Sequence, residues 1–274
     1  MKWITVSRKL GANGSEVART VAGGLGYRFY DTAAIAAMAQ RLGLADSVKE
    51  VDEKPPSIFQ RLFSHRPTVY FDRLYSVIYE LAKQGDAVFL GRGSNILLGA
   101  FNCALHVRVT ASLERRIRTL TERGFSEETA RRAIRQSDAE RSAFVRVAFG
   151  ADWEDPERYH LVLNMDKLSV KLAVSTVVQV ARSREIAEAS ADALKSLERL
   201  GLAKRAEAAL MEGHLLDERS SSMSVMVTGP ASVRVEGFVD SAERRAEAER
   251  LLRAVTGVVS VENDIRVIQV PMGT

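Results

Sequence analysis

A glycine-bearing turn near the amino terminus carries the residues with the clearest chemical meaning. Gly11-Ala12-Asn13-Gly14-Ser15-Glu16 follows an apolar run, Trp3 to Val6, and precedes apolar residues at helical spacing that stop at Gly26. A strand that turns into a helix N-terminus presents free backbone N–H groups and a positive dipole end, both of which suit a phosphate. The turn therefore predicts a phosphate site, and a plain strand–turn–helix packing unit is the alternative.

The turn lacks the lysine of a full phosphate loop. In the pattern G-x-x-x-x-G-K-[ST], the lysine reaches the β- and γ-phosphates and the hydroxyl binds magnesium. Ser15 supplies the hydroxyl, but Gly14 stands at the lysine position. Arg8 and Lys9, just upstream, are the candidates for the missing charge. Asn13 stands where the loop prefers glycine, and we expect the turn to persist because Asn tolerates positive φ better than most residues.

An arginine-rich segment is the second chemically informative feature. Nine arginines and no lysine lie between Glu114 and Arg146, with acidic residues interleaved. Arginine is preferred for bidentate phosphate contacts, but the interleaved acids equally favour a solvated, salt-bridged helical hairpin. Aromatic residues for base stacking are sparse in this segment, so we expect no nucleic-acid partner despite the net charge of +4.

The elements that position these residues alternate between strands and helices, which predicts a parallel sheet with helices on both faces. We expect strands at 2–7, 27–30, 86–91, 103–109 and 159–164. We expect helices at 15–25, 32–42, 70–84, 112–122 and 169–184, and another that Ser126 caps. Residues 49–68, with three prolines, predict a long excursion without regular structure.

The pattern changes after residue 184. Residues 186–212 predict an amphipathic helix, either continuous or broken near Gly201, and Ser220 to Ser222 predict a loop. Strands from Val225 and over 233–239, a helix capped by Ser241, and a final strand within 257–267 complete an α-β-β-α-β order. At 274 residues two domains are expected, and we place them at 1–184 and 185–274.

Composition is that of an ordinary globular protein, with 46% apolar and 27% charged residues. No apolar run approaches the length of a membrane span, so no transmembrane segment is expected. The start has no long apolar region typical of a signal peptide, which favours a cytoplasmic location. Cys103 is expected to be a small core residue, and the four histidines have no metal-ligand spacing.

Several segments together resemble the cytidylate kinase-like family, relatives of the P-loop nucleoside monophosphate kinases. They are, in the family's order, Ile4–Arg8, Gly11–Glu16, Gly26–Asp31, Val88–Asn95, His106–Ala111, Leu113–Ile117 and Tyr159–Asn164. The family's own loop also lacks lysine. The resemblance implies an α/β, P-loop kinase-like parallel sheet with helices on both faces, and ATP and Mg²⁺ as cofactors. It further implies phosphorylation of a nucleoside monophosphate, with CMP as the best guess.

The resemblance also implies roles for residues outside the turn. Ser15 would bind Mg²⁺, and Asp31 would hold a metal-bound water or orient the acceptor. Arg135 and Arg141 lie in a segment that resembles the family's lid, about residues 121–152, whose arginines close over the transferring phosphate.

The acceptor is less well defined by the resemblance. Arg92 is the best candidate for its phosphate, and a structural arginine that bonds loop carbonyls is the alternative. Ala37 stands where the family carries a substrate-binding arginine, so the acceptor stays open. The excursion at 49–68 would belong to the substrate-binding insertion.

The C-terminal segment resembles a BON domain, mainly through Val233–Val239 and the Gly257–Val267 ending. BON domains are associated with binding lipids or other small ligands, so the resemblance implies such a ligand and a regulatory role. A packing or dimerisation module, and thus a homodimer, is the alternative. For the whole chain, the rival to a kinase is a catalytically inactive nucleotide-sensing or scaffold protein.

Overall fold

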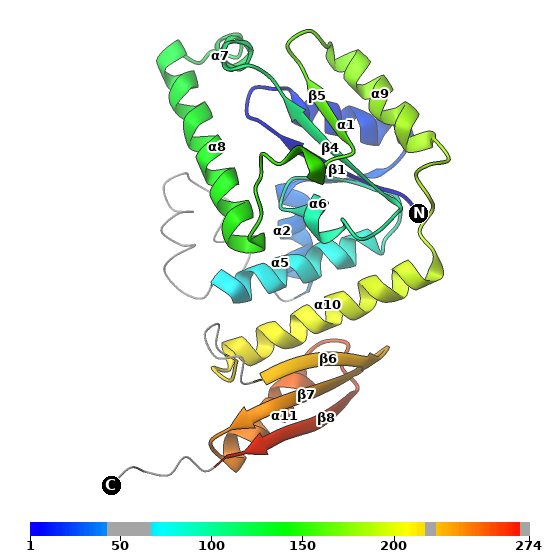
Figure 1. Ribbon diagram of the computed structural model, residues 1–274, viewed down its shortest axis with the longest axis vertical. Helices are drawn as coiled ribbons and strands as arrows, with labels where there is room; N and C mark the ends of the chain where they lie inside the picture. Colours follow the sequence, from blue (N-terminus) through cyan, green and yellow to red (C-terminus); the bar gives the residue numbers. More distant parts are fainter. Residues whose placement is uncertain (43–66, 217–222, 269–274) are drawn as a thin grey trace. The chain divides into compact units, whose positions relative to one another are not determined.

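The computed structural model describes residues 1–42, 67–216 and 223–268. Contacts divide the chain into two units, one of residues 1–37 and 84–190 and the other of residues 38–83 and 191–274 (Figure 1). Residues 49–66 of the expected excursion and the expected loop at 220–222 lie outside the described residues.

The first unit contains a five-stranded parallel sheet in the order β2-β3-β1-β4-β5. The strands are β1 (Trp3–Arg8), β2 (Arg28–Tyr30), β3 (Ala87–Leu90), β4 (Ala104–Thr110) and β5 (Leu161–Asn164), which confirms the five predicted strands. β1 and β3 are buried almost throughout, as expected of parallel strands covered on both faces. Since every pair is parallel, all the carboxyl ends lie at one edge, where ligands bind in such sheets.

The helices of the first unit confirm the predicted alternation. They are α1 (Gly14–Leu25), α2 (Thr32–Arg41, whose last residues fall in the second unit), α6 (Ser94–Leu97), α7 (Leu113–Thr121), α8 (Glu127–Phe149) and α9 (Val170–Arg182), with a short 3-10 turn η2 (Pro156–Arg158). α1 and α9 pack on each other, and Val17, Val21 and Val177 join the strands in one buried apolar cluster. Cys103 is buried, as expected.

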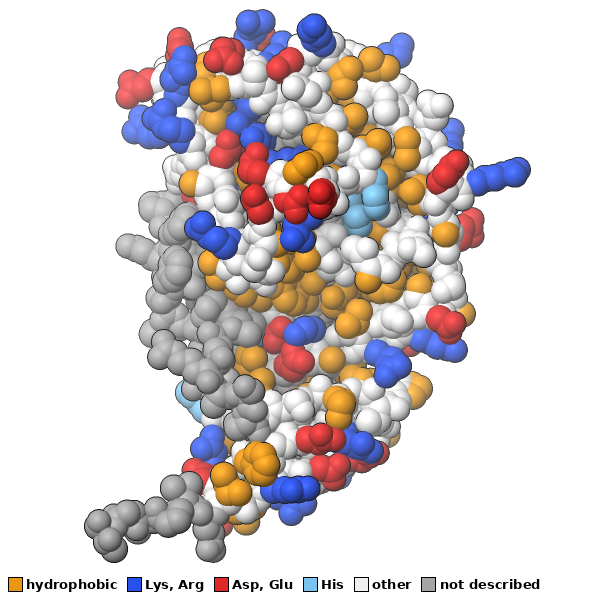
Figure 2. Space-filling model, in the orientation of Figure 1, with side chains coloured by type: hydrophobic (Ala, Val, Ile, Leu, Met, Phe, Trp, Pro, Cys, Tyr) orange, Lys and Arg blue, Asp and Glu red, His pale blue; other side chains and the backbone are white. Residues whose placement is uncertain are grey.

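α7 and α8 form the arginine-rich hairpin. Ser126 caps α8 by accepting a hydrogen bond from the backbone N–H of Thr129, as predicted. In Figure 2, basic and acidic side chains are interspersed on the surface over these two helices. The hairpin also has a small apolar core of its own, where Ile117, Leu120 and Ile134 pack together.

The described part of the second unit contains a three-stranded sheet in the order β6-β7-β8, together with helices. Its elements are α5 (Pro67–Ala82), α10 (Ala191–Glu212), β6 (Met223–Gly229), β7 (Ser232–Val239), α11 (Ala242–Ala254) and β8 (Ser260–Val267). β7 pairs with β6 antiparallel and with β8 parallel. The predicted α-β-β-α-β order is confirmed, and Val233 and Val235 point into the core as the alternation indicates.

The predicted start of the helix at 186–212 is wrong. The helix begins at Ala191, and upstream the backbone N–H of Ala189 donates to the carbonyl of Met1 instead of to a helical partner. Of the two alternatives at Gly201, the structure has the continuous helix, and Gly201 faces Tyr79 and Glu80 of α5. Packing of this kind offsets the roughly 1 kcal/mol that glycine costs in a helix interior.

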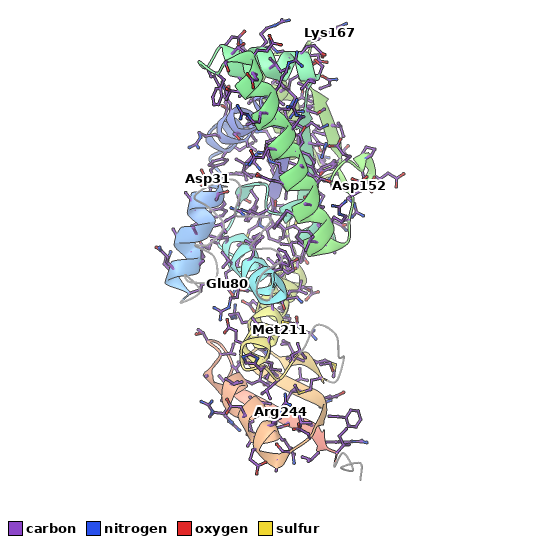
Figure 3. All side chains as sticks on the ribbon, turned by 90° about the vertical axis from the view of Figure 1, so that its left-hand side faces the viewer. Asp31, Glu80, Asp152, Lys167, Met211 and Arg244 are labelled. Carbon is purple, nitrogen blue, oxygen red and sulfur yellow. The ribbon has the colours of Figure 1, made fainter. Side chains whose placement is uncertain are left out.

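α5 and α10 lie side by side and are joined by ion pairs. Asp72 pairs with Lys204 at 3.1 Å, Glu80 with Arg205 at 3.0 Å, Lys83 with Glu198 at 3.7 Å, and Arg73 with Glu212. Figure 3 labels Glu80 on α5 and Met211 on α10. The contacts thus group residues 38–83 with α10, a pairing between segments far apart in the sequence.

Among the described residues, no helix combines the length and the apolar character that crossing a bilayer requires.

Candidate functional site

The glycine-bearing turn is held open by two left-handed residues. Gly11 has φ 82°, and Asn13 has φ 59°, a conformation that Asn tolerates better than most residues. The N–H of Ala12 donates to the carbonyl of Lys9, so Ala12 keeps its own donor inside the turn. Because α1 starts at Gly14, the N–H groups of the first helical residues have no partner within the helix.

A cavity of about 330 Å³ lies on this turn. The predicted nucleotide-binding residues that line it are Arg8, Lys9, Gly11, Asn13, Gly14, Ser15 and Glu16. Ala12 is buried beneath it. Four arginines contribute to the lining, namely Arg8, Arg19, Arg123 and Arg141. The cavity therefore combines helix N-terminal donors with several cationic side chains, as a phosphate site requires.

Arg116 of α7 holds the turn in place by a hydrogen bond and by close packing. Its Nε donates to the carbonyl of Leu10 at 2.7 Å, and its two terminal nitrogens bind both carboxylate oxygens of Asp138 at 2.8 Å. A Cβ on Gly11 would lie 2.7 Å from the Arg116 carbonyl oxygen. Arg116 is therefore a structural arginine that joins the turn to α7 and α8.

Arg8 ends β1, and its side chain is largely buried beside the cavity. Its Nε is inaccessible to solvent and has no hydrogen-bond partner. Burial, and then the neighbouring charges of Arg141 and Arg92, lower the pKa of Arg8 from 12.5 to about 9. A guanidinium in this environment is stabilised by a bound anion.

Lys9 is already engaged with an acidic side chain. Its Nζ lies 3.0 Å from Glu154 Oε2, and Arg108 Nη2 donates to the other oxygen of Glu154 at 2.9 Å. The Arg108 guanidinium also lies 4.5 Å over the ring of Trp153. These contacts hold the segment that follows α8 against the ends of β1 and β4.

Asp31 lies at the end of β2, where α2 begins (Figure 3). One carboxylate oxygen accepts from the N–H of Ala34 at 3.1 Å and so caps α2, and the other lies 3.5 Å from Arg19. Sequence reasoning missed Arg19. It stands four residues after Ser15 and therefore on the same face of α1, which is the signal that could have found it.

Arg92 has an unusual backbone conformation. It has φ 58° between Gly91 at 77° and Gly93 at 71°, and its guanidinium reaches Thr32 Oγ1 at 3.5 Å. A left-handed arginine is costly and persists where surrounding structure enforces it, most often at functional sites. A Cβ on Gly93 would meet the Phe149 ring at 2.1 Å, so the end of α8 packs on this turn.

The structure separates the two predicted lid arginines. Arg141 lines the cavity and donates to the carbonyl of Arg8 at 2.9 Å, and burial lowers its pKa. Arg135 is exposed on α8 and does not line the cavity. Arg123, in the turn between α7 and α8, donates to Asn13 Oδ1 at 2.7 Å. Nothing in the spacing of the sequence singles out Arg123.

The donors for a metal ion are few. Within 1–42, 67–216 and 223–268, no three or more His, Cys, Asp or Glu side chains are grouped to hold a metal. The hydroxyl of Ser15 is exposed at the start of α1 and forms no hydrogen bond with any described residue. Mg²⁺ usually takes one or two protein ligands together with phosphates and waters, so Ser15 fits an ion that arrives with a nucleotide.

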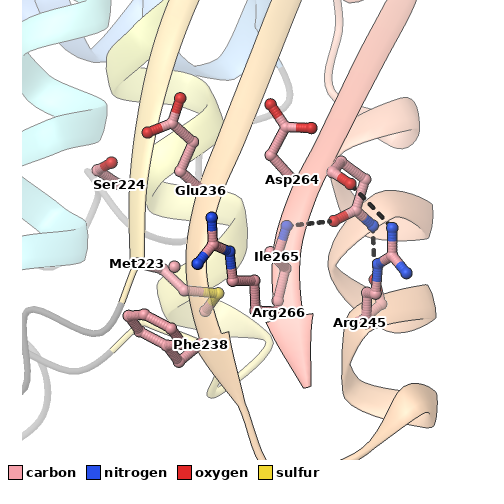
Figure 4. Close-up of a pocket in the computed structure, with 10 residues that line it drawn as sticks. Met223, Ser224, Glu236, Phe238, Arg245, Asp264, Ile265 and Arg266 are labelled. Carbon is pink, nitrogen blue, oxygen red and sulfur yellow. Dashed lines mark hydrogen bonds between the residues drawn. The ribbon is translucent and has the colours of Figure 1, made fainter. Parts of the chain in front are cut away.

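A second cavity, of about 790 Å³, lies at one end of the small sheet (Figure 4). Met223, Gly237 and Ile265 are cross-strand neighbours in its lining. Around them stand Glu236, Asp264, Arg266 and Phe238, and Phe238 is 47% exposed. This lining mixes both charges with apolar surface.

Two family models match the chain. The model of the cytidylate kinase-like family matches residues 3–167, and that of the BON domain matches residues 204–269. No curated protein matches.

Among solved structures, an uncharacterized protein from Eubacterium ventriosum is similar, with a TM-score of 0.54 and 18% identity, covering 67% of this chain and 100% of that one. At this identity the likeness shows a shared fold. Shikimate kinase from Bacteroides thetaiotaomicron follows with a TM-score of 0.41 and 12% identity, covering 66% of this chain and 99% of that one. Deoxyadenosine kinase from M. mycoides, with bound dATP, has a TM-score of 0.39 and 14% identity, covering 66% and 100%.

Proposed function

Because the chain belongs to the cytidylate kinase-like family, we propose that it transfers a phosphoryl group from ATP to a nucleoside monophosphate, with CMP as the first acceptor to test. The observation that carries this proposal is the cavity on the turn between β1 and α1. It presents the N-terminus of α1 together with the largely buried guanidinium groups of Arg8 and Arg141. Phosphoryl transfer depends on positioning and charge neutralisation, which these groups supply.

In the proposed reaction, an oxygen of the acceptor's phosphate forms a bond to the γ-phosphorus of ATP. The bond from that phosphorus to the β,γ-bridging oxygen breaks, and its electron pair leaves with ADP. The attacking oxygen is already ionised, so no proton has to be removed. Mg²⁺ bound with the nucleotide would neutralise phosphate charge, with the Ser15 hydroxyl as its protein ligand.

The remaining residues serve to orient the two substrates. The N–H groups at the start of α1 would hold the donor phosphates. Arg92 would bind the acceptor's phosphate, since it lies at the carboxyl end of β3 beside Arg8. Asp31, one strand further along the same edge, would orient the acceptor. Closure of α8 would bring Arg141 onto the transferring group.

A catalytically inactive nucleotide-sensing protein is the second candidate. Gly14 at the lysine position and Ala37 at the acceptor arginine position favour it, and so does Asp31, whose two oxygens already have partners. In that case ATP would bind without turnover.

A coupled assay that measures ADP release from ATP and Mg²⁺, run over CMP, UMP, AMP and GMP, tests the proposal. Turnover with one of them is the expected result. Calorimetry that detects ATP binding without turnover would favour the sensing protein, and absence of both would mean that the turn is structural. Arg141→Ala and Arg135→Ala form a matched pair on one helix. We expect the larger loss of turnover from Arg141→Ala. Equal losses would show that Arg135 also acts in the site.

For the second unit, we propose that the cavity in Figure 4 binds a small ligand or a lipid and thereby regulates the kinase. The match to the BON domain and the partly exposed Phe238 support this proposal. A homodimer formed through this unit is the alternative. Vesicle co-sedimentation of the full chain, with Phe238→Ala as the variant, tests the lipid.

A further inference from the structure

The space in front of Gly14, where a phosphate-loop lysine would stand, is filled by another side chain. A Cβ added to Gly14 would lie 2.4 Å from Arg8 Cβ and 3.1 Å from Val109 Cβ. Contacts under 3.0 Å essentially never occur for real Cβ atoms. Gly14 therefore cannot carry a lysine while Arg8 keeps its position.

The end of the Arg8 side chain depends on a second glycine. A Cβ on Gly91 would lie 2.4 Å from Arg8 Nη1 and 3.5 Å from Arg8 Cζ. Gly91 has φ 77° and directly follows β3, the strand that neighbours β1. The guanidinium thus passes along the carboxyl edge of the sheet, from the donor turn towards Arg92 on the proposed acceptor side.

This guanidinium has no partner within the described residues. Arg8 makes no side-chain hydrogen bond or ion pair there, and its Nε is sealed from solvent. The charges that act on it most are those of Arg141 and Arg92, and the opposing carboxylate is that of Asp31. A buried charge among like charges destabilises a folded protein unless an anion compensates it.

The other cations of the cavity already have partners. Lys9 pairs with Glu154 at 3.0 Å. Arg141 donates to a backbone carbonyl, Arg123 to Asn13, and Arg19 pairs with Asp31. Arg8 is the cation of the lining whose donors are uncommitted among the described residues.

On the basis of the proposed kinase function, we propose that Arg8 takes the role of the missing phosphate-loop lysine and contacts the donor's terminal phosphates. The Cβ of residue 8 leaves no room for a side chain at position 14, so in this proposal the cation comes from the end of β1 instead of from the start of α1. Gly14 and Gly91 are then the two places where the chain gives this side chain room.

Calorimetric titration of the full chain with ATP and Mg²⁺ tests this inference. Arg8→Met, which keeps much of the side-chain volume, should weaken ATP binding about 10- to 100-fold, the scale of a charge-assisted hydrogen bond. Arg132→Met, at an exposed arginine of α8 that does not line the cavity, is the control, and its affinity for ATP should stay within about threefold of wild type. Lys9→Met tests the rival assignment, and its loss of affinity should be smaller than that of Arg8→Met because Lys9 is already paired with Glu154. Thermal unfolding of the free proteins should show that Arg8→Met is no less stable than wild type, since it removes an uncompensated charge.

Gly14→Lys provides a second, independent measurement. Alone it should abolish ATP binding, because its Cβ meets Arg8. Combined with Arg8→Gly, which also removes the Cβ that would lie 2.4 Å away, it should bind ATP more tightly than either single variant, because the lysine then has room beside the turn. This pair keeps the inference falsifiable even if Arg8→Met folds poorly.

The outcomes separate the inference from the proposed function. If wild type binds ATP and Arg8→Met binds it equally well, or Lys9→Met causes the larger loss, the assignment to Arg8 is wrong and the kinase proposal stands. If wild type binds no ATP, both fail. A structural role for Arg8 would lower the melting temperature without changing the affinity for ATP, and would also overturn the inference.

Discussion

The buried His106 makes the first unit sensitive to acid in a way that can be calculated. Its Nδ1 lies 2.8 Å from Thr5 Oγ1, and its Nε2 is buried without a hydrogen-bond partner. The ring of His160 stacks on it with centroids 4.8 Å apart. Burial, and then the charge of His160, lower the pKa of His106 from 6.5 to about 4. Protonation is therefore harder in the folded protein than in the unfolded chain.

The sign of the effect follows from linkage. A base whose pKa falls on folding contributes stability that is present above its unfolded pKa and is lost as pH decreases through the window between the two values. With pKa values of 6.5 and about 4, the free energy of unfolding should fall by about 2 kcal/mol between pH 7.5 and pH 5. Most of the loss should occur below pH 6.5.

Guanidinium unfolding followed by tryptophan fluorescence measures this loss in the first unit, because both tryptophans, Trp3 and Trp153, belong to it. In His106→Gln the dependence between pH 7.5 and pH 5 should disappear, whatever the absolute stability. His214→Gln, at an exposed histidine of the second unit, should leave it unchanged. A wild-type unfolding free energy that is flat over this range, or an equal slope in His106→Gln, would refute the reasoning.

Three further predictions follow from other contacts. Burial raises the pKa of Asp72 to about 6, so the second unit should lose stability as pH rises from about 4 to 6; Asp72→Asn should remove this dependence in hydrogen-exchange measurements on α5. Gly11→Ala should cost about 1–3 kcal/mol of unfolding free energy and weaken ATP binding, because its Cβ would clash with a backbone carbonyl. Gly26→Ala, at an equally left-handed glycine with nothing within 4 Å of its Cβ, should cost stability alone, and an equal loss of affinity would contradict the role of the turn. Hydrogen exchange over residues 121–152 should slow when ATP and the acceptor bind, and unchanged exchange would indicate a fixed hairpin.

The amino-acid pattern alone located most of the fold. Apolar runs of strand length and apolar residues at helical spacing predicted the five strands of the first sheet and the helices around it, because burial of these residues is what forms the elements. Features set by neighbouring residues in the sequence could also be predicted. The cap that Ser126 forms on α8 was predictable, since capping depends on near neighbours in the chain.

The site could be predicted only in part. The turn of residues 11–16 and the need for a substitute cation followed from the pattern, but the choice between Arg8 and Lys9 did not. The proposed assignment to Arg8 rests on Glu154, which pairs with Lys9, and on Gly91, which lies against Arg8. Both residues are far away in the sequence and meet these side chains only in the folded sheet. Arg123 likewise reaches Asn13 across 110 positions of the chain.

The grouping of residues 38–83 with α10 was decided by tertiary structure. Linear order suggests a division near residue 184, because a sequence shows where an apolar helix lies but not which neighbour covers it. α10 contacts α5 and β6 within its unit, so the helix packs against two neighbours at once. Ion pairs such as Asp72–Lys204 then complete the pairing with α5. Burial of apolar area is favourable against any complementary surface. The order of segments in the chain therefore does not determine which surface an apolar helix packs against.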